Sequence, residues 1–436
     1  MATACHKSEA KAKAEAVHAV TKDIISELPR TVIESILECM PIQDAVKTSI
    51  LSRKWRYKWA MLPQLVFDYK FFEYLDNKGD QVSEFASIID KVLLLHTSPI
   101  IKFVLYNPPE HSARTEDIDQ WILFLSRNGI KDFTLQNSSV VRYKLPTHLF
   151  ACPELAHLKL SKCTFNLPSD YKGFRNLLSL QFRAVTYAAD SFGSFISGCP
   201  RLETLALDYC PGSGHLNIHA PNLKHLSVRG ALESIRIHNA QNLLTLSICE
   251  SQMRRSSGPN MIRVLGCLPM IEKLDIGLDF YEFLAAGDVP KRLPTEMNCL
   301  KNLTLESVDF SKVGEILCAL CLLRSSPNLQ ELDISATRNA DMVPALNFLE
   351  EDCRLNRLQV VKFRSIIGLE SELELIKSLL ACSPLLERMF IGCHAELDAN
   401  AMLMMSKELL RFRRASPKAE IIFGDPLEDP LEDIQA

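Results

Sequence analysis

The sequence has no excess of charge of one sign and no long uninterrupted hydrophobic run. Its 49 basic and 53 acidic residues give a formal net charge of -4. Nucleic acid is therefore an unfavoured partner, because binding a phosphate backbone needs a local excess of Lys and Arg. No apolar run approaches the length of about 18 residues that a membrane span requires, and residues 1–22 hold no apolar stretch that could act as a signal peptide. We expect a soluble protein of the nucleus or cytoplasm, with no membrane partner.

The common signatures of catalytic and metal sites are also missing. The sequence contains no GxxxxGK[ST], GxGxxG, GxSxG or HExxH motif, which disfavours the usual phosphate, dinucleotide, hydrolase and zinc-protease chemistry. One group of histidines is close in sequence: His215, His219, His225 and His238. Alternation along strands would send neighbouring side chains to opposite faces, and no cysteine or carboxylate pattern accompanies them. We predict no catalytic residue, no metal site and no cofactor.

The 14 cysteines have no pattern of a disulfide framework. They are spread along a long chain without an export signal, which favours reduced thiols. Cys318 and Cys321 form a CxxC pair, but no second pair stands at zinc-site spacing. Because the pair lies in the apolar helical run EILCALCLLRSS, we predict that both are core thiols.

What the chain does contain is 47% hydrophobic residues over 436 positions, enough for a large core. Residues 23–62 alternate short helical patterns with breaks. The apolar side chains of a first helix recur at i, i+3, i+4 and i+7: Ile33, Ile36, Leu37 and Met40. Pro41 ends that helix, a second short helix follows, and a third can begin at Ser52 with Trp55 and Trp59 four residues apart.

Three helices in about forty residues are at the lower limit for an independent core. Their excess of apolar residues predicts a surface that is buried against another protein, although a helical cap on the next domain would explain the same composition. The stretch from Leu28 through Trp55 resembles an F-box, and LSRKWRYKWAMLPQLVFD resembles the version found in plant F-box proteins with leucine-rich repeats.

An F-box docks on a Skp-type adaptor, which connects it to a cullin-RING ubiquitin ligase. The resemblance therefore implies an adaptor-binding role, in forming or supporting the interface, for the residues at motif positions. These are Leu28, Pro29, Ile33, Ile36, Leu37, Pro41, Ile42, Val46, Leu51 and Trp55.

The rest of the chain is repetitive. Phrases such as CPRLETLAL, APNLKHLSV and SPNLQELDI share the form LxxLxL. Their first anchors are Leu155, Leu177, Leu202, Leu223, Leu243, Ile271, Leu300, Leu329, Leu358 and Leu386, at intervals of 22, 25, 21, 20, 28, 29, 29, 29 and 28 residues. This spacing is typical of leucine-rich repeats, in which each LxL is a short strand of a parallel sheet. The intervals of 28 or 29 leave room for a helix on the convex side, and those of about 20 do not.

The C-terminal part, including LQVVKF, ELELIKSLLACSPLLERMFI and RASPKAEIIF, resembles the FBD region of plant F-box/FBD/leucine-rich-repeat proteins. We therefore expect an α/β fold: a three-helix F-box, then an irregular leucine-rich-repeat solenoid, an arc with a parallel sheet on its concave face, ending in an FBD-like cap. The predicted boundaries are a tail at 1–22, the F-box at 23–62, the solenoid at 63–354, the FBD-like repeats at 355–424 and a second tail at 425–436.

An arc of repeats presents the x residues of LxL as an extended binding face. The candidate target-binding residues are Lys159, Arg183, His225, Arg229, Arg236, Lys273, Glu306 and Asp333, together with neighbours such as Gln181, Asp275, Glu331, Lys362 and Arg364. Each could equally be a solvated strand position. The leading hypothesis is a non-catalytic substrate receptor of a Skp-cullin-F-box ubiquitin ligase. A non-degradative scaffold and a small-molecule-dependent sensor are the alternatives.

Overall fold

The computed structural model describes residues 28–77, 85–109, 113–169, 171–212, 215–230, 232, 234–239, 241–249, 264–265, 268–277, 281, 289–337 and 355–424. The chain divides into two compact units, Met1–Val140 and Val141–Ala436. The predicted tails at 1–22 and 425–436 lie outside the described residues.

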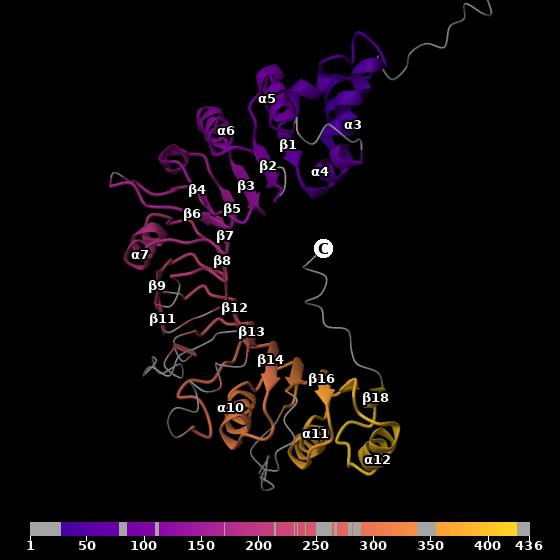
Figure 1. The fold of residues 1–436 in the computed structure, drawn as a ribbon. Coiled ribbons are helices and arrows are strands. Elements are labelled where there is room, and N and C mark those ends of the chain that lie inside the picture. The colour runs from indigo at the N-terminus through magenta and orange to yellow at the C-terminus, as the bar shows by residue number, and fades with distance from the viewer. Residues whose placement is uncertain are drawn as a thin grey trace, which may run out of the picture. The chain divides into compact units, whose positions relative to one another are not determined.

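Unit 1 combines short helices with three parallel strands (Figure 1). Its elements are α2 (Arg30–Glu38), α3 (Ile42–Lys47), η1 (Thr48–Ile50), η2 (Lys58–Met61), β1 (Gln64–Phe67), α4 (Tyr69–Asp76), α5 (Phe85–Leu95), β2 (Lys102–Asn107), α6 (Thr115–Arg127) and β3 (Asp132–Asn137). Strand β2 pairs in parallel with β1 and with β3. The rings of Phe67, Phe103 and Phe133 line up across these strands, with centroids 5.7 and 6.3 Å apart. They form the core on which the N-terminal helices pack.

The predicted helices of the F-box-like segment are confirmed for α2 and α3, but the third is wrong as an α-helix. Residues 53–57 form turns, and the short 3₁₀ helix η2 follows. The Ser49 hydroxyl donates to the Arg56 carbonyl at 2.7 Å, which closes the chain back on η1. Trp55 and Trp59 are still both buried, at 3% and 4% exposure. Turns deliver the two indole rings to the core as well as a helix would.

Unit 2 is built on one long parallel sheet in the order β5-β7-β8-β10-β12-β13-β14-β15-β16-β17-β18. These strands are β5 (His157–Ser161), β7 (Ser179–Arg183), β8 (Thr204–Asp208), β10 (His225–Arg229), β12 (Thr245–Cys249), β13 (Lys273–Ile276), β14 (Asn302–Val308), β15 (Glu331–Ala336), β16 (Val360–Ile366), β17 (Arg388–Cys393) and β18 (Glu420–Gly424). Two further pairs stand apart: β4 (Tyr143–Lys144) with β6 (Cys163–Thr164), and β9 (His215–His219) with β11 (Ser234–His238). The long parallel sheet of leucine-rich repeats is thus confirmed.

The register of this sheet explains the LxxLxL pattern. Leu180, Leu205 and Leu226 are directly opposite one another on neighbouring strands, and all three are buried. Each strand therefore points its two aliphatic residues to one side, as alternation requires. Asparagines just before the anchors join the repeats: the side-chain amides of Asn222 and Asn242 donate to the carbonyls of Pro200 and Pro221, at 2.8 and 3.0 Å.

Spacing also predicted correctly what lies behind the strands. The helices of unit 2 follow the longer intervals: η4 (Thr147–Ala151), α7 (Ala189–Ser197), α10 (Val313–Arg324), α11 (Glu370–Cys382) and α12 (Ala399–Leu409). Where the interval is about 20 residues, β9 and β11 take the place of a helix. In Figure 1 the strands of unit 2 line the inner side of its curve and the helices its outer side. The outward-facing x residues are therefore on the concave side.

A buried glutamate ties α11 to the loop before it. One carboxylate oxygen of Glu372, Oε2, accepts hydrogen bonds from the backbone N–H groups of Ile367, Gly368 and Leu369, at 3.2, 2.7 and 2.9 Å. The side chain is fully buried, and burial raises the pKa of the Glu372 carboxyl to about 7 against the three stabilising bonds. Desolvation therefore outweighs hydrogen bonding at this site.

We expect Glu372 to make the protein less stable as the pH rises from about 4.5 to about 7. In that range the unfolded chain releases the proton first, so rising pH favours unfolding, by about 3 kcal/mol in total. Glu372→Gln keeps an acceptor oxygen without the charge and should remove this slope. Urea unfolding at pH 5 and pH 8 measures it, with Glu374→Gln as the exposed control on the same helix. Equal pH slopes for wild type and Glu372→Gln would contradict the expectation.

Candidate functional site

Helix α2 carries two adjacent stripes of apolar residues that have different fates. Ile33 and Leu37 are four residues apart and pack inward, at 4% and 0% exposure. Val32 and Ile36, also four apart, remain 41% and 39% exposed. Pro29, at the N-terminal end of the helix, is exposed too. The helix therefore keeps an apolar stripe on its outer side that the chain itself does not cover.

More apolar surface follows α3. Ile50 and Leu51, at the end of η1, are 86% and 64% exposed, and Tyr57 is 61% exposed. Leaving several large apolar side chains of one small segment in water is costly unless a partner covers them. We name the set Pro29, Val32, Ile36, Ile50 and Leu51 the exposed F-box surface.

The predicted adaptor-binding residues divide between surface and core. Leu28 and Val46 are half-buried, and Pro29, Ile36, Pro41 and Leu51 are exposed. The other four, Ile33, Leu37, Ile42 and Trp55, are at most 4% exposed, so they can support an interface but not contact a partner. The sequence interpretation missed Val32 and Ile50. The i, i+4 spacing of Val32 from Ile36 was the signal that could have identified the first of them.

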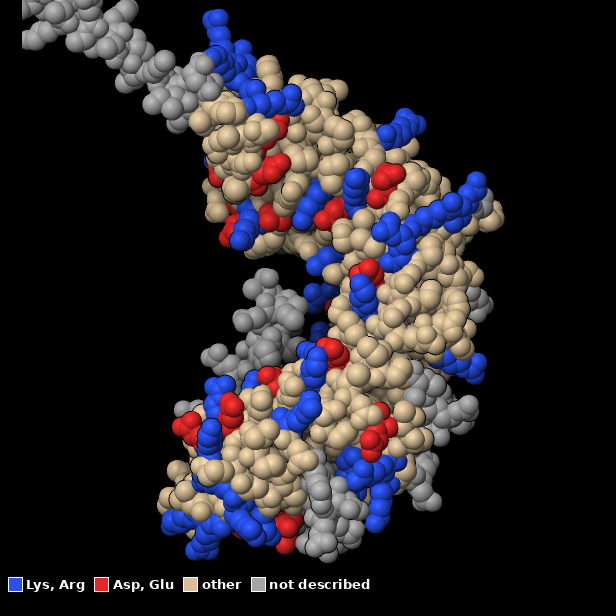
Figure 2. Space-filling view, turned by 180° about the vertical axis from the view of Figure 1, so that it is seen from behind, with Lys and Arg blue, Asp and Glu red and all other residues tan. Residues whose placement is uncertain are grey.

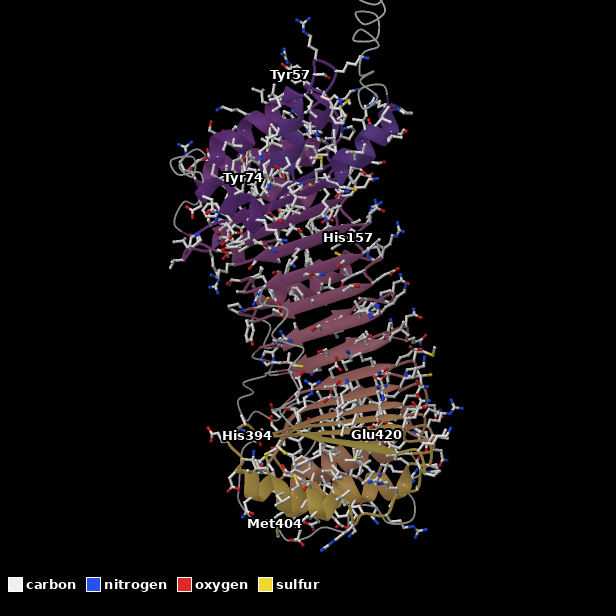
Figure 3. The ribbon with its side chains drawn as sticks, turned by 90° about the vertical axis from the view of Figure 1, so that its right-hand side faces the viewer. Tyr57, Tyr74, His157, His394, Met404 and Glu420 are labelled. Atoms are coloured by element: carbon white, nitrogen blue, oxygen red, sulfur yellow. The ribbon has the colours of Figure 1, made fainter. Side chains whose placement is uncertain are left out.

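The outward positions of unit 2 form rows across its sheet, because neighbouring strands pair in register. One row runs His157, Ser179, Thr204, His225, Thr245, Lys273, Asn302, Glu331, Val360, Arg388 and Glu420. Figure 3 looks onto this face, with His157 towards one end of the ladder and Glu420 towards the other, on the same side. Lys159, His225, Lys273 and Asp333 of the predicted target-binding set lie in the rows.

The placement of Arg236 on this face was wrong. Arg236 lies in β11, which pairs with β9 in a separate two-stranded sheet. The segment SIRIH alternates like the other strands, so its sequence does not distinguish which sheet it joins. The same pairing separates the histidines: His215, His219 and His238 belong to this small sheet and His225 to the long one. Within the described part of the chain, no three metal-ligating side chains come together.

Charges on the long sheet alternate rather than accumulate. Arg183, Asp208 and Arg229 are opposite one another on β7, β8 and β10. Further along, Arg364 binds Asp333 through two hydrogen bonds of 3.1 and 2.8 Å. On the side seen in Figure 2, Lys and Arg are likewise mixed with Asp and Glu. Such a mixed surface favours specificity and steering over raw affinity.

The CxxC pair is part of the core, as predicted. Cys318 and Cys321 lie on α10 at 0% and 2% exposure. Burial raises the pKa of the Cys318 thiol to about 12 and that of Cys321 to about 11. Both thiols therefore stay protonated and unreactive at neutral pH.

A cavity of about 690 Å³ lies between the first repeats of unit 2, lined by η4 and residues 168–176. Its walls include the aromatic rings of Phe150 and Tyr171 and the charged side chains of Lys172 and Arg175. It is the place in the described structure where a small molecule of mixed polarity would fit by size.

Comparison with known proteins agrees with these two surfaces. A model of the F-box domain matches residues 25–66, and a model described as "FBD-associated F-box protein At5g56370, LRR repeats" matches residues 118–334. The F-box/FBD/LRR-repeat protein At1g13570 of Arabidopsis thaliana is 39% identical over 419 residues, covering 92% of this chain and 98% of that protein. The chain belongs to the F-box/FBD/LRR-repeat protein family.

Other members of this family are more distant over the same length. The FBD-associated F-box protein At5g56370 of Arabidopsis thaliana is 25% identical, covering 92% of this chain and all of that protein. A solved structure titled "Crystal structure of Rad7 and Elc1 complex in yeast" matches with a TM-score of 0.30 and 13% identity, over 83% of this chain and 94% of that one, a likeness too low to support an argument. No helix among the described residues is long and apolar enough to cross a membrane.

Proposed function

We propose that this F-box/FBD/LRR-repeat protein is the substrate receptor of a Skp-cullin-F-box ubiquitin ligase. The F-box would hold a Skp-type adaptor, and the concave strands of unit 2 would hold a target protein. The observation that carries the proposal is the exposed F-box surface: large apolar residues are left uncovered in the segment that matches the F-box domain.

In this role the chain needs no nucleophile of its own. Ubiquitin transfer would be performed by the ligase, and the receptor would contribute by bringing two reactants together. Holding reactants in a fixed geometry converts a bimolecular step into an effectively unimolecular one, which is a large rate effect by itself. The proposed role is therefore orientation without catalysis.

Capture experiments in plant cells test this function. The full chain and its variant Val32→Glu, Ile36→Glu are compared for bound proteins by mass spectrometry and for the abundance of those proteins. A receptor loses the adaptor but keeps its target in the variant, and the target then becomes more abundant. A target whose abundance is the same with both versions would indicate a scaffold. Binding that requires an added metabolite would indicate a sensor.

The basic ends of β7 and β10 should contribute to target binding. Reversing charge with Arg183→Glu and Arg229→Glu together should weaken a target that has an acidic surface about tenfold at low salt, and less at higher salt, because salt screens exposed charges within about 8 Å at physiological ionic strength. Arg236→Glu, on the separate small sheet, is the matched control. Target affinity at two salt concentrations measures the effect. An unchanged affinity and salt dependence would remove these arginines from the proposed site.

A further inference from the structure

The outward face of the long sheet changes character over its last three strands. From β5 to β15 the outward residues are polar or small, such as Ser227, Ser247 and Thr304. On β16, β17 and β18 the outward residues include Val360, Phe390 and Ile422. Large apolar side chains therefore project from the concave side in the FBD-like repeats, where the rest of the described sheet projects none.

The geometry places these side chains side by side. Lys362, Phe390 and Ile422 are direct neighbours across β16, β17 and β18. Ile422 is 39% exposed, and Val360 and Phe390 are half-buried. The guanidinium of Arg388 lies over the Phe390 ring, 5.8 Å from its centroid. An aromatic ring beside arginine and aliphatic groups is the composition of binding hot spots.

The surface has positive charge around its apolar centre. Lys362 and Arg388 flank Phe390 on neighbouring positions, and Glu420 is opposite Arg388 on β18. Arg364 is already paired with Asp333. We call Val360, Lys362, Arg388, Phe390 and Ile422 the β16–β18 surface. A fitting occupant carries aliphatic side chains among several carboxylates.

The chain itself contains such a segment next to this surface. Residues 425–436 read DPLEDPLEDIQA, with five acidic residues, no Lys or Arg, and the aliphatic residues Leu427, Leu431 and Ile434. The segment begins directly after Gly424, two residues beyond Ile422. Its 12 residues can span up to about 40 Å, whereas neighbouring strands are only about 4.8 Å apart. Reach and charge therefore both suit the β16–β18 surface.

We propose that residues 425–436 fold back on the β16–β18 surface, with their leucines against Phe390 and Ile422 and their carboxylates beside Arg388 and Lys362. Tethering makes this docking feasible at modest intrinsic affinity, because a short linker gives an effective concentration of the order of millimolar. The docking is independent of adaptor binding and of the proposed ligase function. It would cover one end of the concave face until a competitor displaced it.

The test uses the full chain and a fluorescent peptide of residues 425–436. A tail variant, Leu427→Ser, Leu431→Ser, Ile434→Ser, should lose the internal competitor and bind the peptide at least tenfold more tightly than wild type by fluorescence anisotropy. Adding Phe390→Ser to the tail variant should abolish peptide binding, and adding Arg388→Glu should weaken it at least fivefold at low salt. Circular dichroism shows whether each variant is folded.

Met404→Ser in the tail variant is the matched control, because Met404 is an apolar residue of α12 that is 61% exposed (Figure 3). Its peptide affinity should not change. Three results would overturn the proposal: no peptide binding by the tail variant at 1 mM, equal binding by wild type and tail variant, or undiminished binding when Phe390→Ser and Arg388→Glu are each present. Loss of binding in Met404→Ser alone would place the segment on α12 instead.

Discussion

Replacing Val32 and Ile36 by glutamate should reduce the affinity for a Skp-type adaptor by at least 100-fold. Both side chains are exposed on the outer stripe of α2, so the free protein tolerates the change. In the complex the same positions would be desolvated. Burying an unpaired carboxylate there and losing the apolar contacts should cost about 3 kcal/mol or more, and each 1.4 kcal/mol is a factor of ten in affinity.

Titration calorimetry of purified adaptor with the full chain measures this effect. Leu94→Glu is a matched control, since Leu94 is an 83% exposed leucine of α5 outside the F-box. The control should bind the adaptor like the wild type. Unchanged affinity of the α2 double variant would remove this stripe from the adaptor interface, while weakened binding by both variants would point to a general effect of added charge.

Truncating one leucine of the repeat core should destabilise unit 2 by about 2 to 5 kcal/mol. Leu205 and Leu332 are the predicted core residues of their repeats, and the structure buries them to 0% and 1% exposure. In a stacked array each repeat depends on its neighbours, so the cavity left by Leu205→Ala also weakens the packing of Leu180 and Leu226.

Urea unfolding followed by circular dichroism measures this loss for Leu205→Ala and Leu332→Ala separately. Thr204→Ala is the control, because Thr204 is next to Leu205 but points to the outward face. It should change the free energy of unfolding by no more than about 0.5 kcal/mol. If Leu205→Ala and Thr204→Ala unfolded at the same urea concentration, the inward assignment of the leucines would be wrong.

Much of the fold was determined by local repetition in the sequence. The LxxLxL spacing identified the strands, and alternation placed Leu205 and Leu332 inside and Arg183 and Arg229 outside. Interval length identified which connections hold a helix, since about eight further residues are what α10 and α11 require. These features depend on distances of a few residues along one chain, where the periodicity of strands and helices is direct evidence.

Only the tertiary structure decided which partner each element meets. Ile33, Ile36 and Leu37 have the same helical spacing, yet packing buries Ile33 and Leu37 and leaves Ile36 exposed. Arg236 alternates like Arg229, yet β11 joins a different sheet. Helical or strand periodicity shows which residues share a face but not what covers that face, because the covering atoms come from segments distant in sequence. The exposed F-box surface and the β16–β18 surface are both of this kind.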